Sequence, residues 1–199
     1  MSHKAKSLFV AIVILFLPGC TDPQIIEDEN VEVPDTLPEY LNLEAETAGR
    51  EIDRGQTINI LEDANGQNTL LLWVSTGCTG CHDWTEVIAE EMRNGNISND
   101  TRIITVHRYP SFESKEEVIS VYASENESTE SLWPVVIPNE GQPAIDVEMD
   151  QETEYDYAKA FGNPATPSLT ILDGDGKTIW KNKTYWANQS VLDEALEYL

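Results

Sequence analysis

The sequence predicts an α/β fold in which a central mixed β-sheet is flanked by helices. Strand patterns alternate with helix patterns from residue 57 onwards, and one strongly apolar strand leads directly into a helix. The chain then closes with a hairpin and a last helix. With 199 residues, of which 40% are hydrophobic, it is long enough for one domain with a substantial core.

The first expected elements lie on either side of a turn. Residues 57–61 are expected to form a strand, and Asn65-Gly66 a turn. Residues 69–75 are apolar at nearly every position, which is typical of a strand buried on both faces. A helix is expected next, because apolar side chains recur at helical spacing until Asn94-Gly95 ends the pattern. These side chains belong to Trp84, Val87, Ile88 and Met92.

The alternation continues through the second half of the chain. Residues 102–107 form the next expected strand, and a capping box that starts at Ser114 opens a helix. A short strand is expected at residues 135–137. A further helix is expected to open at Thr153 and to stop at Gly162.

The last elements are a hairpin and a helix. Residues 168–172 and 178–180 flank the turn sequence Asp-Gly-Asp-Gly, which is typical of a hairpin. An amphipathic helix is expected from about Ser190 to the end of the chain.

The chain carries a formal net charge of −24, with 36 acidic and 12 basic residues. A surface of this sign repels phosphate backbones and anionic headgroups, so we expect no nucleic-acid partner. The simplest interpretation of the acidity is solubility, because net charge acts on solubility and association rather than on fold.

Residues 1–20 have the features of a bacterial lipoprotein signal peptide. Two lysines precede an apolar run at residues 8–17, which is too short to span a bilayer, since a spanning helix needs roughly 20 residues. Leu-Pro-Gly-Cys follows at residues 17–20 and resembles a lipobox, whose cysteine is lipidated. We therefore expect lipidation of Cys20, attachment to the cell envelope, and a domain in the periplasm or otherwise outside the cytoplasm. The alternative is an ordinary secreted protein with a free Cys20.

Residues 21–46 are expected to form an acidic, disordered tether between this anchor and the domain. They contain nine acidic residues and three prolines, and no basic residue. Such a segment buries too little apolar surface to fold and extends by self-repulsion. The domain is then expected to span residues 47–199.

The remaining two cysteines form a Cys-x-x-Cys motif, Cys78-Thr79-Gly80-Cys81. It lies where the predicted buried strand ends and a helix begins. The free N–H groups and the dipole of a helix N-terminus stabilise a thiolate at Cys78, which could attack a disulfide. Cys81, one turn further on, could then attack the resulting mixed disulfide. Lipidation of Cys20 would leave these two as the only thiols of the mature chain.

Residues 70–84, LLLWVSTGCTGCHDW, resemble the active-site strand, loop and helix of the thioredoxin superfamily. A second segment, residues 162–168, resembles the threonine–cis-proline loop of the same superfamily, with Thr166 and Pro167 at the corresponding positions. The resemblance covers residues 45–199. It is strongest to membrane-tethered, TlpA-like reductases outside the cytoplasm, which have a strand–helix insertion before the cis-proline loop.

This resemblance implies a function and its partners. It implies a thiol–disulfide oxidoreductase that reduces client proteins, is recharged by a membrane thiol-electron carrier and needs no cofactor or metal. Thr166 and Pro167 would hold the client chain, and Cys78 and Cys81 would exchange disulfides. The sequence departs from the superfamily at Gly77, usually Trp, at Gly80, usually Pro, and at Leu72, often an acid. These departures leave the direction of electron flow open, so oxidation or isomerisation is an alternative.

Other interpretations use the same residues. The run from Cys78 to His82 also matches the haem c attachment motif, with Met92 or Met149 as a second axial ligand. A zinc site would add His107, and a copper-handling domain would use the two cysteines with a histidine. Finally, the cysteines could form a static disulfide in a tethered binding module.

Overall fold

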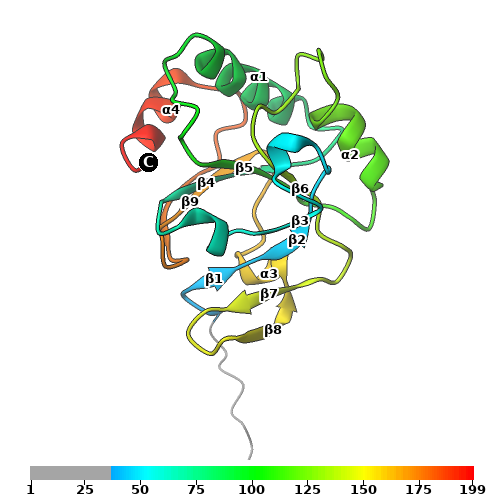
Figure 1. Ribbon diagram of the computed structural model, residues 1–199, viewed down its shortest axis with the longest axis vertical. Helices are drawn as coiled ribbons and strands as arrows, with labels where there is room; N and C mark the ends of the chain where they lie inside the picture. The colour runs from blue at the N-terminus through cyan, green and yellow to red at the C-terminus, as the bar shows by residue number, and fades with distance from the viewer. Residues whose placement is uncertain (1–36) are drawn as a thin grey trace, which may run out of the picture. The chain divides into compact units, whose positions relative to one another are not determined.

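A five-stranded mixed sheet lies at the centre of this computed structural model, which describes residues 37–199 (Figure 1). The strand order is β10-β9-β4-β5-β6. β4 pairs in parallel with β5 and β5 with β6, whereas β9 is antiparallel to both β4 and β10. The strands are β4 (Thr69–Val74), β5 (Ile103–His107), β6 (Val135–Val136), β9 (Ser168–Leu172) and β10 (Thr178–Asn182).

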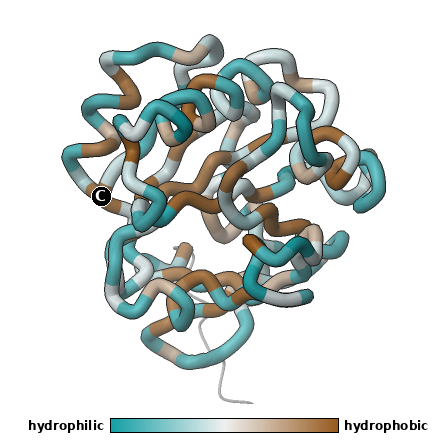
Figure 2. The backbone as a smooth tube through the Cα atoms, turned by 45° about the horizontal axis from the view of Figure 1, so that its top comes forward, coloured by the Kyte–Doolittle hydropathy of each residue, from teal (hydrophilic) through white to brown (hydrophobic). Residues whose placement is uncertain are grey.

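Three helices cover one face of this sheet: α1 (Thr79–Arg93), α2 (Lys115–Tyr122) and α4 (Gln189–Leu196). Alternate residues of β4 point to opposite faces, so Leu70 and Leu72 join the core under the helices while Leu71 and Trp73 join a second core. Every residue of β4 is buried, as expected. Figure 2 shows the hydrophobic segments concentrated in these central strands. The predicted central mixed sheet flanked by helices is confirmed.

The second core lies against a layer of short strands on the other face of the sheet. One small sheet has the order β1-β7-β8, and β2 pairs with β3. The elements of this layer are β1 (Leu41–Asn42), β2 (Glu44–Glu46), β3 (Thr57–Asn59), β7 (Pro143–Asp146), β8 (Gln151–Asp156) and α3 (Tyr157–Ala160). Two short helices, η1 (Glu51–Asp53) and η2 (Glu62–Ala64), follow β2 and β3 along the chain.

The predicted boundary between tether and domain, at residues 46/47, is wrong. Leu41 of β1, Leu43 between the two strands and Ala45 of β2 are buried. Glu44 is exposed and Glu46 is half-buried. Apart from Asn42, which is buried and hydrogen-bonded to Asn59, this is the two-residue period of a strand with one buried face. Acidic side chains on the outer face mask it in the composition. Residues 1–36, with the expected signal peptide and most of the expected tether, lie outside the described residues.

The helix predicted from Thr153 to Gly162 is only partly a helix, because residues 153–156 belong to strand β8. β8 occupies residues 151–156, with half-buried Thr153 and Tyr155 alternating with exposed glutamates. The helix begins only at Tyr157, because the Asp156 side chain caps it by accepting a hydrogen bond from the Lys159 N–H at 2.8 Å. β7 and β8 form a hairpin, which precedes the cis-proline loop in the chain.

The other predicted elements are confirmed with small shifts of their ends. The capping box at Ser114 is present, with both of its hydrogen bonds to Glu117. α4 begins at Gln189, with Asn188 as its cap. Within residues 37–199, no helix combines the length and apolar character needed to cross a membrane.

A buried ion pair connects η1 to β6 of the central sheet. The Asp53 side chain is fully buried, and its Oδ1 lies 2.9 Å from Arg50 Nη2. The same oxygen accepts a hydrogen bond from the Val135 N–H of β6 at 2.9 Å. Arg50 also donates to the carbonyl oxygens of Ser131 and Trp133. The charges are therefore paired and hydrogen-bonded, which burial requires.

Candidate functional site

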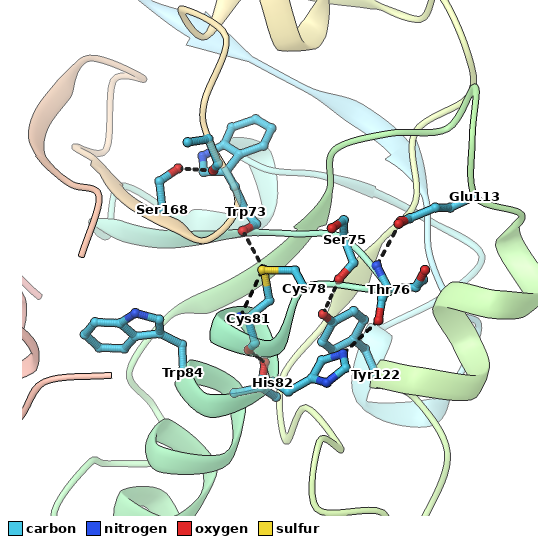
Figure 3. The surroundings of a disulfide bond; sticks show 12 residues. Trp73, Ser75, Thr76, Cys78, Cys81, His82, Trp84, Glu113, Tyr122 and Ser168 are labelled. Carbon is cyan, nitrogen blue, oxygen red and sulfur yellow. Dashed lines mark hydrogen bonds between the residues drawn. A yellow bond between two sulfur atoms is a disulfide. The ribbon is translucent and has the colours of Figure 1, made fainter. Parts of the chain in front are cut away.

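Cys78 and Cys81 are joined by a disulfide at the N-terminus of α1 (Figure 3). Their Cα atoms are 5.2 Å apart and their sulfur atoms 2.27 Å apart. Cys78 is 8% exposed and Cys81 is 0% exposed. The pair predicted from the sequence is therefore brought together, and Cys78 is the sulfur that a partner can reach first.

Both sulfurs have polar backbone neighbours. The Cys78 Sγ accepts a hydrogen bond from the backbone N–H of Cys81 at 3.1 Å, as the N-cap of α1. The Cys81 Sγ lies 3.9 Å from the carbonyl oxygen of Trp73, under the end of β4. Opening of the disulfide leaves the Cys78 sulfur facing a helix N-terminus, which favours a thiolate there.

The predicted cis-proline loop lies beside this pair. The Thr166–Pro167 bond is cis. The next residue, Ser168, pairs with Trp73 where β9 lies against β4. Trp73 is also the residue whose carbonyl oxygen lies next to the Cys81 sulfur. Thr166 is half-buried, and Pro167 is buried. The fold therefore brings together the Cys-x-x-Cys motif and the threonine–cis-proline loop.

A loop that follows β10 packs against the Cys-x-x-Cys motif at Gly80. A Cβ on Gly80 would lie 3.0 Å from two ring carbons of Tyr185 and still closer to its carbonyl oxygen. Trp84 Nε1 donates to the carbonyl oxygen of Thr184 at 2.8 Å, which holds the loop on α1. Any side chain that begins with a Cβ at position 80 would therefore overlap this loop.

The same loop carries two exposed aromatic side chains, of which Tyr185 lies against Gly80 of the motif. Tyr185 is 46% and Trp186 58% exposed. Their rings pack edge to face, with centroids 5.0 Å apart. Nothing in the local sequence pattern indicated this position, because the contact with α1 joins residues about 100 positions apart.

Three side chains hold the backbone of Ser75 and Thr76, which leads to Cys78. The Tyr122 hydroxyl donates to the carbonyl oxygen of Ser75 at 2.7 Å, and burial raises the pKa of Tyr122, which keeps this donor protonated. The Thr76 N–H donates to Glu113 Oε2 at 2.9 Å. The Thr76 carbonyl oxygen accepts a hydrogen bond from His82 Nε2 at 2.8 Å. No local pattern in the sequence indicates a role in the site for Glu113 or Tyr122.

Glu113 is itself held by a buried histidine. His107 Nε2 lies 2.8 Å from the same Glu113 Oε2, and the His107 side chain is fully buried. Burial lowers the pKa of His107, although the hydrogen bond to Glu113 acts in the opposite direction. The neutral ring therefore donates through Nε2, and its Nδ1 has no hydrogen-bond partner among the described residues.

The residues of the other interpretations are placed as follows. His82 is hydrogen-bonded to the carbonyl oxygen of Thr76, and His107 is hydrogen-bonded to Glu113. Within residues 37–199, no three His, Cys, Asp or Glu side chains are grouped to hold a metal ion. Cys20 lies outside the described residues.

Comparisons with known proteins identify the fold. No family model and no curated protein sequence matches the chain. Among solved structures, it is similar to the thioredoxin domain of a thiol-disulfide oxidoreductase from Bacteroides vulgatus, at 14% identity and a TM-score of 0.53, over 82% of this chain and 98% of that one.

Two further structures are similar to it. One is a thiol:disulfide interchange protein, a thioredoxin family protein from Chlorobium tepidum, at 11% identity and a TM-score of 0.55, over 82% of this chain and 97% of that one. The other is the pneumococcal exposed lipoprotein thioredoxin from Streptococcus pneumoniae, at 16% identity and a TM-score of 0.50, over 79% and 99%. The described residues therefore have the thioredoxin fold, and the chemistry of the site has to be argued from its own residues.

Proposed function

We propose that this protein is a lipid-anchored thiol–disulfide oxidoreductase that reduces disulfides of client proteins outside the cytoplasm. One observation carries the proposal: the Cys78–Cys81 pair lies at the N-terminus of α1, directly beside a cis-proline loop, in a thioredoxin fold. A purely structural disulfide gains nothing from this position. A redox pair gains a stabilised thiolate and a neighbouring backbone on which a client can lie.

The reaction begins from the dithiol form. The Cys78 thiolate attacks a client disulfide, forms a mixed disulfide and displaces one client thiolate, which takes up a proton. The Cys81 thiolate then attacks the Cys78 sulfur and releases the second client thiol. Two electrons have passed to the client, and the site ends in the disulfide form. A membrane thiol-electron carrier supplies the two electrons that restore the dithiol.

The loop at Thr166 and Pro167 serves as the client-binding edge. Its backbone precedes β9 and lies next to the strand position that contacts Cys81. The half-buried Thr166 leaves backbone accessible to an extended client chain, which binds through main-chain hydrogen bonds. The exposed Tyr185 and Trp186 provide apolar contact area at the same site.

The anchor is proposed from residues 1–20 and from Cys20. The apolar run, the adjacent lipobox and the acidic tether fit a domain held away from a membrane surface. The similar pneumococcal structure is that of an exposed lipoprotein. Substitution Cys20→Ser should abolish incorporation of a labelled fatty acid and move the protein from the membrane to the soluble fraction. Equal labelling of both forms would refute the anchor while leaving the redox proposal intact.

Trapping of clients tests the redox function. Substitution Cys81→Ser should accumulate mixed disulfides through Cys78, because the resolving thiol is gone. The double variant Cys78→Ser/Cys81→Ser is the matched control and should trap nothing. The wild-type dithiol should also reduce insulin. If the single variant traps no client and the wild type leaves insulin unreduced, the proposed function is wrong.

The direction of electron flow is tested by the reduction potential of the pair. A value near that of thioredoxin, about −270 mV, is expected for a reductase. A value of about −120 mV would make the protein an oxidant instead.

A further inference from the structure

We propose that Glu113 is a positioning residue of the redox site, which holds the backbone at Thr76 and thereby fixes Cys78 close to Cys81 when the disulfide is open. The inference rests on the proposed redox function and deepens it. It adds a residue from the segment between β5 and α2, outside both motifs that identify the site.

The contact is made by one oxygen of the carboxylate. Glu113 Oε2 accepts the Thr76 N–H at 2.9 Å and lies 2.8 Å from His107 Nε2. The Glu113 side chain is 17% exposed and the His107 side chain is fully buried. One oxygen of Glu113 therefore joins the backbone at Thr76 to a buried side chain of β5.

His107 gives the carboxylate a fixed direction. It lies at the end of β5, a fully buried strand, so its ring cannot move independently of the core. Its backbone is also held, because the Tyr157 hydroxyl donates to the His107 carbonyl oxygen at 2.8 Å. The chain of contacts therefore runs from the core, through His107 and Glu113, to the segment that carries Cys78.

The contact matters most in the dithiol form. In the disulfide form the Cys78–Cys81 bond itself ties the segment to α1. Opening of that bond removes the tie, and the segment is then held by its contacts with Tyr122, Glu113 and His82. Loss of the Glu113 contact frees the segment more in the dithiol than in the disulfide form. The dithiol gains entropy, so the disulfide becomes harder to close and easier to reduce.

Two conservative variants separate position from charge. Glu113→Asp keeps the charge but withdraws the oxygen by one methylene group. Glu113→Gln removes the charge but keeps an oxygen that can accept both hydrogen bonds, because both are made to Oε2. Glu116→Gln removes an exposed charge three residues further on, in the first turn of α2, and is the matched control.

The test measures the reduction potential of Cys78–Cys81 in full-length protein, equilibrated with dithiothreitol redox buffers. Glu113→Asp should lower the equilibrium constant for closing the disulfide about tenfold, which is about 30 mV towards less reducing potentials. Glu113→Gln and Glu116→Gln should match the wild type. Thermal unfolding of the oxidised proteins checks that all three variants are folded.

The outcomes distinguish the inference from the function on which it rests. If Glu113→Asp has the wild-type potential, or Glu113→Gln shifts it as much as Glu113→Asp does, then Glu113 does not act by position and the inference is overturned. These measurements need no client. A wild type that does not reduce insulin therefore counts against the proposed function and leaves the result on Glu113 standing.

Discussion

Substitution Gly80→Ala places one methyl group against the loop that follows β10. The new Cβ would lie 3.0 Å from two Tyr185 ring carbons, and ordinary contact begins at 3.4 Å, so the ring must withdraw by 0.4 Å and the carbonyl oxygen by more. The loop cannot withdraw freely, because Trp84 and Asp83 hydrogen-bond its backbone on either side of Tyr185.

The expected loss of stability follows from these contacts. Forcing a methyl group into a packed site costs about 1–3 kcal/mol, and the anchored backbone here favours the upper end. Alanine recovers about 0.5–1 kcal/mol, since it is the better residue in a helix. We therefore expect Gly80→Ala to lower the free energy of unfolding by about 2 kcal/mol, combining these two effects. At about 2–4 °C per kcal/mol, Tm falls by about 4–8 °C.

Thermal unfolding of the oxidised protein measures this change. Gly77 supplies the control, because it lies three residues before Gly80, between β4 and α1, and a Cβ there would have no heavy atom within 4 Å. Gly77→Ala should leave Tm unchanged within about 2 °C, as exposed substitutions usually do. Equal Tm values for Gly80→Ala and Gly77→Ala would show that the loop does not pack on Gly80 in this way.

Three further predictions follow from other parts of the structure. Asp53→Asn should lower the free energy of unfolding by about 3–5 kcal/mol in urea denaturation, since it breaks a buried ion pair, whereas the exposed Glu51→Gln should have little effect. Trp186→Ala should raise KM for a protein disulfide at least about fivefold and leave reduction of a small disulfide unchanged. Met149→Ala, at another exposed position, is the control. Equal KM values for Trp186→Ala and the wild type would exclude a client contact at Trp186. Burial lowers the pKa of His107 below 6.5, so the unfolded chain takes up a proton that the folded one does not, and stability falls as pH drops from about 6.5 towards the folded pKa. An NMR titration midpoint of His107 at or above 6.5 would contradict this.

Local patterns explain which parts of the site the sequence could predict. β4, the start of α1 and the two cysteines lie within one short segment, where a buried strand and a helix pattern meet. The pairing of this segment with the cis-proline loop was predicted by resemblance, and the pairing of Ser168 with Trp73 bears out their proximity. The strand β8 was missed because Tyr157, Ala158 and Phe161, just after it, have helical spacing.

The departures at Gly77 and Gly80 show what local patterns do not contain. In the sequence, Gly77 directly precedes Cys78 and Gly80 directly precedes Cys81. The resemblance to the superfamily leads one to expect a larger residue at both positions. In the structure only Gly80 is constrained by a neighbour, because Tyr185 comes from a loop about 100 residues further along the chain. Glu113 likewise reaches Thr76 across 37 positions. The motif therefore identifies the reacting sulfurs, while the groups that position them come from distant elements and become visible only when the chain is folded.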